Sequence, residues 1–280
     1  MGALEWVTMT NLVSVAGKDW STGREYVVTA SDSQTTYGDG TIARERMKKL
    51  GFHGSGFIVG AGNMELMHHI YSELRKLQNE TGDLGPPNNI GELAKIYANE
   101  FSDPSGNAKD LSWITSGVPE TGYLNHLKKK YADGKEIKCK PSPVLSAGIG
   151  AKSGEDYHAQ NPRGWMGLMT DLEVAVNLAL GVSRYAARNP AVNEWVQLGI
   201  LTREKAEKEG VYGPVEAYAF YPNDMISGHA LPQKGVSLTV KNYHNLEQLW
   251  NLVDQHVLNR PPKAASDRPQ IQIPGIPAYR

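Results

Sequence analysis

The chain has 280 residues, which is enough for one large domain or two small ones with a sizeable core. Its 29 basic and 30 acidic residues give a net charge of −1, which excludes a protein that binds nucleic acid through a general basic excess. The single cysteine, Cys139, excludes an intrachain disulfide and a cysteine-based zinc site, and it fits a reducing compartment.

The first third of the chain predicts three strands and a helix. Alternation predicts a strand at residues 10–15, and a β-rich run predicts a second strand at 26–31, with a polar hairpin between them. A third strand is predicted at 56–59. Asn63 is a suitable N-cap for a helix that begins at Met64, because apolar residues then recur at helical spacing.

The middle of the chain has weaker patterns. A capping-box-like pair predicts a helix over 89–101. Residues 102–165 form an expanded segment with short β-like runs at 111–115 and 144–149, inside connections rich in Gly, Pro and Ser. The basic run 128–130 is interpreted as a solvated helix end.

The last third again mixes both kinds of element. We expect an apolar helix at 171–188, a highly charged helix at 202–209, strands at 215–221 and 236–241, and a helix at 245–258. The tail 261–280 has five prolines and is interpreted as an extended arm outside the core.

The order of the elements predicts the fold class. Strands occur in runs and helices in pairs, which favours antiparallel sheets flanked by helices over alternating βαβ units. We therefore expect an α+β protein, a four-layer αββα sandwich, with one main domain at residues 10–260. No apolar run approaches the roughly 18 residues of a membrane span. Residues 1–7 are too short and lack the basic start of a secretory signal, so we expect a cytoplasmic protein.

Several familiar motifs fail on spacing. Residues 148–153 miss the phosphate-loop pattern, with Ser146 and Ala151 where its two glycines belong. His68 and His69 are adjacent on a helix and point about 100° apart, so they cannot share a ligand face. There is no H-E-x-x-H motif and no Cys/His cluster. We expect no metal and no cofactor.

One set of residues agrees in both type and spacing. Thr10 begins a strand, and Asp32 follows the next strand. Lys48 lies sixteen positions beyond Asp32, and Gly62 lies fourteen beyond Lys48. Over residues 10–78 this pattern resembles the opening of the proteasome β-subunit family of N-terminal-nucleophile (Ntn) hydrolases, with the bacterial HslV subunit as its nearest form.

The resemblance implies a threonine peptidase. Thr10 would be the N-terminal nucleophile, and its α-amine, with an ordinary pKa of about 7.7–8.0, would be the base. Lys48 would lower the pKa of the Thr10 hydroxyl, and Asp32 would orient Lys48. The backbone N–H of Gly62 would stabilise the oxyanion.

The resemblance also implies a substrate site and an assembly. Thr36 would pair with an extended substrate, Gly60 would line the site, and Thr35 and Met64 would shape the first side-chain pocket. The substrate would be a peptide or unfolded protein inside a homo-oligomeric ring, with an AAA+ ATPase as a possible partner and no nucleic-acid or membrane partner.

Residues 1–9 bear on this hypothesis, because Thr10 must become a chain terminus. They are either a propeptide removed by self-cleavage or the result of a true start at Met9, and Thr8 is a rival nucleophile. Two alternatives stay open. One is an amidohydrolase or peptide ligase on the same fold, and the other is an inactive structural subunit of a ring.

Overall fold

The computed structural model describes residues 10–19, 22–36, 41–81, 90–97, 111–118, 124–132, 135–148, 171–190, 192–205, 212–223, 225, 232 and 234–269. Within them the chain is a mixed α/β protein with two large, mostly antiparallel sheets. In this part of the chain, no helix is long and apolar enough to cross a membrane. The rival nucleophile Thr8 and the rest of residues 1–9 lie outside the described residues.

The larger sheet has six strands in the order β10-β1-β2-β11-β12-β13. Their bounds are β1 Asn11–Lys18, β2 Glu25–Asp32, β10 Val144–Gly148, β11 Val196–Lys205, β12 Tyr212–Pro222 and β13 Val236–Tyr243. All neighbours are antiparallel except β12 and β13, which run parallel and depart from the expected all-antiparallel sheets.

The second sheet has five antiparallel strands in sequence order. They are β5 Leu50–His53, β6 Gly56–Gly62, β7 Leu111–Gly117, β8 Asn125–Ala132 and β9 Lys135–Lys138. Two short strands, β3 Thr35–Thr36 and β4 Ile42–Arg44, form a separate pair. This pair lies between the strand that ends at Asp32 and the lysines that precede β5.

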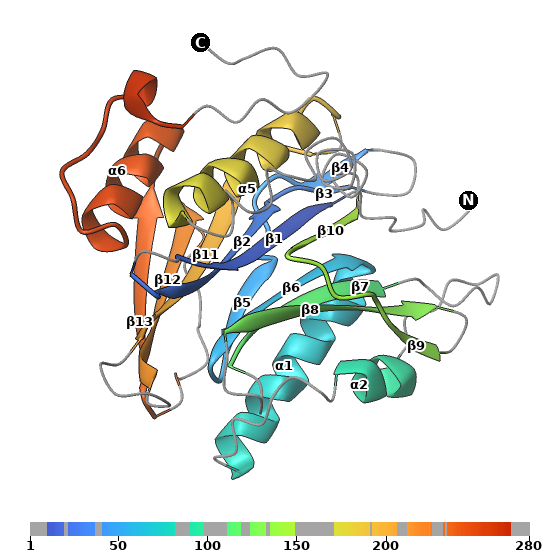
Figure 1. The fold of residues 1–280 in the computed structure, drawn as a ribbon. Helices are drawn as coiled ribbons and strands as arrows, with labels where there is room; N and C mark the ends of the chain where they lie inside the picture. Colours follow the sequence, from blue (N-terminus) through green and yellow to red (C-terminus); the bar gives the residue numbers. More distant parts are fainter. Residues whose placement is uncertain are drawn as a thin grey trace.

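Helices lie outside both sheets (Figure 1). Helices α5 Leu172–Ala186 and α6 Leu246–His256 cover the six-stranded sheet, while α1 Met64–Thr81 and α2 Ile90–Tyr97 lie against the five-stranded one. Side-chain caps fix the starts of α5 and α6: Asp171 accepts from the Glu173 N–H, and Asn245 accepts from the Gln248 N–H.

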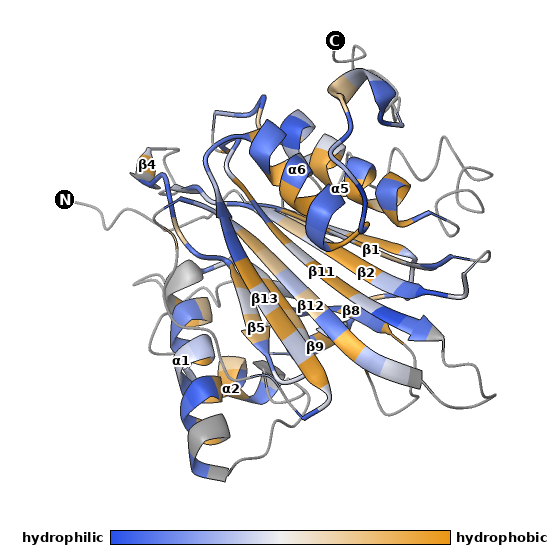
Figure 2. Ribbon diagram, turned by 90° about the vertical axis from the view of Figure 1, so that its left-hand side faces the viewer, coloured by the Kyte–Doolittle hydropathy of each residue, from blue (hydrophilic) through white to orange (hydrophobic). Residues whose placement is uncertain are grey.

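Three buried hydrophobic clusters hold these parts together. One joins α5 and α6 to the six-stranded sheet, one fills the space between the two sheets, and one joins α1 and α2 to the five-stranded sheet. Figure 2 shows the corresponding hydrophobic colour along the strands that lie beneath α5 and α6. The middle cluster includes Leu12, Val27 and Leu50, so the apolar residues next to the candidate site also connect the two sheets.

Most predicted elements are present, and two assignments are wrong. The charged segment predicted as a helix from residue 202 is, over its described part, the end of β11. The lysines 128–130 lie in β8, not at a helix end, and Lys129 pairs with Glu136 at 2.7 Å. By composition alone, both charged segments favour a helix. In the fold, both lie in strands, where neighbouring strands supply partners for the charged side chains.

The described part of the tail packs against α6 and does not extend freely. Arg268 is 8% exposed and binds both carboxylate oxygens of Asp254 at 3.2 and 2.7 Å. Arg260 and Lys263 both contact Glu173 at the start of α5, at 2.6 and 3.2 Å. The folded part of the chain therefore continues past the expected boundary at residue 260.

Candidate active site around Thr10

The candidate site is built where β1 begins and β2 ends. Thr10 immediately precedes β1 and has no exposed surface. Asp32 is the last residue of β2 and is also fully buried. The antiparallel register of β1 and β2 brings these two positions to the same end of the sheet.

The lysine that joins them is Lys49. Its Nζ donates to Thr10 Oγ1 at 3.0 Å and to the two oxygens of Asp32 at 2.9 and 3.0 Å. It also donates to the backbone carbonyl of Gln34. An ammonium group has three protons, and three residues surround this one. Thr10, Lys49 and Asp32 therefore form one buried polar group, which we call the Thr10 group.

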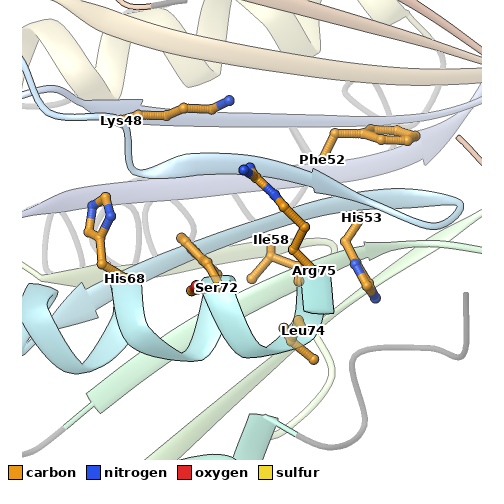
Figure 3. Close-up of a pocket in the computed structure, with 10 residues that line it drawn as sticks. Lys48, Phe52, His53, Ile58, His68, Ser72, Leu74 and Arg75 are labelled. Atoms are coloured by element: carbon orange, nitrogen blue, oxygen red, sulfur yellow. The ribbon is translucent and has the colours of Figure 1, made fainter. Parts of the chain in front are cut away.

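The assignment of Lys48 to this group is wrong by one residue. Lys48 lies away from Asp32, in a cavity beside α1, with its ammonium 5.1 Å from the ring centre of Tyr221 (Figure 3). Side chains alternate in direction along an extended segment, so a shift of one residue moves a lysine to the opposite face. The true intervals are seventeen residues from Asp32 to Lys49 and thirteen from Lys49 to Gly62.

The carboxylate of Asp32 is held in its ionised form by its neighbours. Oδ1 accepts from the Asn11 N–H at 2.8 Å, and Oδ2 accepts from the Gln34 N–H at 3.0 Å. Burial raises the pKa of Asp32, while Lys49 and these two N–H groups oppose that rise. Burial lowers the pKa of Lys49, and Asp32 opposes the decrease. Donors occupy both carboxylate oxygens, so a protonated carboxyl group would find no acceptor here.

The chemistry open to Thr10 follows from this pairing. A lysine ammonium that donates to Oγ1 stabilises negative charge on that oxygen and so favours loss of the hydroxyl proton. The same ammonium has no free lone pair and cannot accept the proton. A base must therefore come from elsewhere, and the α-amine of Thr10 itself would be the nearest nitrogen once it is released.

Gln197, on β11, is a supporting residue that the sequence did not single out. Its Oε1 accepts from the backbone N–H groups of Lys49 and Leu50 at 2.9 and 3.0 Å, and its Nε2 donates to the carbonyl of Met47 at 2.7 Å. One buried amide thus fixes the backbone on both sides of Lys48. It lies 148 residues from Lys49, and no local pattern could have revealed it.

Gly148 is a second residue whose role appears only in the fold. It ends β10, pairs with Asn11, and has a φ of +73°. A Cβ at this position would lie 1.6 Å from the backbone oxygen of Thr10. The strand beside Thr10 therefore needs glycine at position 148. The rest of the segment 148–153 lies outside the described residues.

The remaining predicted site residues lie on neighbouring elements. Gly62 ends β6 with a φ of 112°, directly before Asn63, whose side chain accepts from the Leu66 N–H at 3.1 Å and caps α1. Gly60 is in β6, where a Cβ would meet the side chain of Met67 at 2.6 Å. The role of Gly62 as an oxyanion donor stays a prediction.

The predicted substrate residues are only partly placed. Thr35 and Thr36 form β3 and are fully buried, and Thr36 pairs with Ile42 of β4. Pairing with β4 uses one edge of β3. Met64 is the first residue of α1.

Comparisons with known proteins add no family assignment. No protein-family model matches the chain, and no curated protein matches it. Among the residues that the structure describes, no group of three or more His, Cys, Asp or Glu side chains could hold a metal ion. The candidate site is therefore defined by its own geometry, a threonine hydroxyl bound to a buried lysine–aspartate pair.

Proposed function

We propose that this protein is a threonine-type peptidase of the Ntn-hydrolase kind, with Thr10 as its nucleophile after residues 1–9 are removed. The contact that carries the proposal is the 3.0 Å hydrogen bond from Lys49 Nζ to Thr10 Oγ1, with Asp32 on the same ammonium. Two sheets with helices outside them support the finer proposal of a four-layer αββα sandwich.

The proposed reaction uses Thr10 twice. Its α-amine, with an ordinary pKa of about 7.7–8.0, takes the hydroxyl proton while Oγ1 attacks the carbonyl carbon of a peptide bond. The C–N bond breaks, the amine proton goes to the leaving nitrogen, and an ester joins the acyl group to Thr10. Water then attacks the ester with the same amine as base, which releases the acid and restores Thr10.

Lys49 and Asp32 have fixed parts in this scheme. Lys49 keeps its proton and stabilises the developing alkoxide of Thr10, and Asp32 holds Lys49 in place. Thr10 has no exposed surface. The proposal therefore requires that removal of residues 1–9 both frees the α-amine of Thr10 and opens its hydroxyl to substrate. We propose Gly62 as the oxyanion donor, and residues 35, 36, 60 and 64 as the substrate site.

The proposal also covers the class of substrate and the assembly of the protein. A nucleophile next to short strands suits an extended peptide or an unfolded protein. A ring of identical subunits, with an AAA+ ATPase as partner, would restrict access to such segments. Acyl transfer from Thr10 to an amine instead of water would give a peptide ligase, and product analysis with an added amine separates the two reactions.

The decisive experiment combines intact-mass measurement with covalent labelling. Purified protein is treated with a β-lactone or epoxyketone probe, alongside Thr10→Ala, Thr10→Ser and the matched control Thr22→Ala, which changes an exposed threonine in the first hairpin. We expect a mass that begins at Thr10, labelling of wild type and Thr22→Ala, slower labelling of Thr10→Ser, and none of Thr10→Ala. A chain that retains residues 1–9 and takes no label would support an inactive subunit and overturn the proposal.

A further inference from the structure

A cavity of about 300 Å³ lies between α1 and the hairpin of β5 and β6, apart from the Thr10 group. Lys48 borders it from the segment before β5, and Arg75, Ser72 and His68 border it from α1 (Figure 3). Lys48 and Lys49 point to opposite sides of the same segment, so the cavity has a lysine of its own. Its volume is at the lower end of the range for small-molecule sites.

The polar lining of this cavity is basic. Lys48 and Arg75 are cations, His53 and His68 add two imidazoles, and none of the described residues that line the cavity is acidic. Burial and the nearby charge of Arg75 lower the pKa of Lys48 to about 8. Like charges that share a half-buried site repel each other, and a bound anion would relieve that repulsion.

The rest of the lining is apolar. Phe52, Ile58 and Leu74 are buried core residues that border the cavity. The hydroxyl of Tyr71 is already used, since it donates to the carbonyl of Lys49 at 3.1 Å, so Tyr71 offers the cavity mainly its ring. A site that holds both cations and apolar groups suits a ligand with one charged end and one apolar end.

We propose that this cavity binds a phosphomonoester with a small apolar or aromatic body. A phosphate carries a charge of about −1.5 to −2 near pH 7 and three acceptor oxygens. The two cations match that charge, and the Ser72 hydroxyl adds a neutral donor. A carboxylate would balance only one of the two cations. The proposal is independent of peptidase activity, because neither Thr10 nor Lys49 lines the cavity.

Isothermal titration calorimetry at pH 7 and constant ionic strength tests this assignment on the full chain. The probes are phenyl phosphate, inorganic phosphate, and benzoate as the carboxylate counterpart. The variants are Arg75→Gln and Lys48→Met. Lys76→Gln is the matched control, because it removes one positive charge from the next position of α1, where Lys76 is exposed and pairs with Glu73 at 2.5 Å.

We expect wild type and Lys76→Gln to bind phenyl phosphate alike, and inorganic phosphate more weakly because it lacks the apolar body. Arg75→Gln and Lys48→Met should each weaken phenyl phosphate binding about tenfold or more, the usual effect of losing one charge-assisted hydrogen bond. Arg75 is exposed, so its variant decides the question even if Lys48→Met does not fold. Equal binding of benzoate, equal weakening by Lys76→Gln, or no binding of phenyl phosphate would each overturn the assignment.

Discussion

Removing the ammonium of Lys49 is the most informative change to the Thr10 group. In Lys49→Met the buried carboxylate of Asp32 keeps two N–H donors but loses its counter-ion, and Oγ1 of Thr10 loses its donor. Breaking one side of a fully buried ion pair costs about 3–5 kcal/mol of folding free energy. The loss of one preorganised donor at a reacting oxygen lowers the rate by about 10²–10³-fold.

Two further variants separate stability from chemistry. Lys48→Met removes the adjacent lysine, which borders the cavity beside α1. It should change the labelling rate of Thr10 less than about threefold, because the ammonium that donates to Thr10 Oγ1 belongs to Lys49. The double variant Lys49→Met/Asp32→Asn removes both buried charges. Replacing a whole buried pair is often close to neutral, so it should recover most of the lost stability without recovering activity.

The measurements are urea unfolding at pH 7 and the rate of covalent labelling by a β-lactone probe. The reasoning requires a large coupling free energy between Lys49 and Asp32 in the double-mutant cycle. It also requires the two lysine variants to differ strongly in labelling rate. If Lys48→Met lost as much activity as Lys49→Met, or if the double variant were less stable than Lys49→Met, the described register of this segment would be refuted.

Two other substitutions test residues that contact strand β1 or the residue before it. His126 is buried, with its ring nitrogens 2.8 Å from Ser14 Oγ and from the carbonyl oxygen of Ser142, and burial lowers its pKa to about 4. In the unfolded state His126 binds a proton at about pH 6.5, so the free energy of unfolding should fall by about 3 kcal/mol between pH 6.5 and 4. His126→Gln should remove that share of the pH dependence in urea unfolding. An unchanged pH dependence in the variant would contradict the low pKa of His126. Gly148→Ala should destabilise the protein more than Gly235→Ala, which has a φ of +88° but open space around it and costs only about 1–2 kcal/mol of backbone strain. Equal losses of stability in the two glycine variants would mean that the backbone oxygen of Thr10 does not exclude a side chain.

The parts of the fold with clear periodicity could be predicted from the sequence. Strands β1 and β2 contain runs of β-branched and aromatic residues, and α1 has both a cap and a continuous apolar face. The error at residues 202–205 arose because a charged run favours a helix when it is taken alone. In the fold, Arg203 is 5% exposed and pairs with Glu25 at 2.7 Å, so tertiary pairing outweighs local propensity.

The candidate site shows where reasoning from spacing stops. Counting residues led to the right pair of lysines but to the wrong member, because an interval does not record which way a side chain points. The backbone of Lys49 is held by Gln197 on β11. Gly148, which leaves room for the backbone oxygen of Thr10, belongs to β10. Both depend on long-range pairing of strands, which a single sequence does not display.

The charged contacts of the tail change what counts as the smallest stable piece of this protein. Asp254 is fully buried and depends on Arg268 and Arg260 for its counter-ions. A chain cut at the proline pair 261–262 would keep the described strands of the two sheets and helices α1, α2, α5 and α6, but it would lack Arg268. The shortest autonomous fragment therefore ends beyond Arg268, and the length of any truncated version should be set by this ion cluster and not by the last long helix.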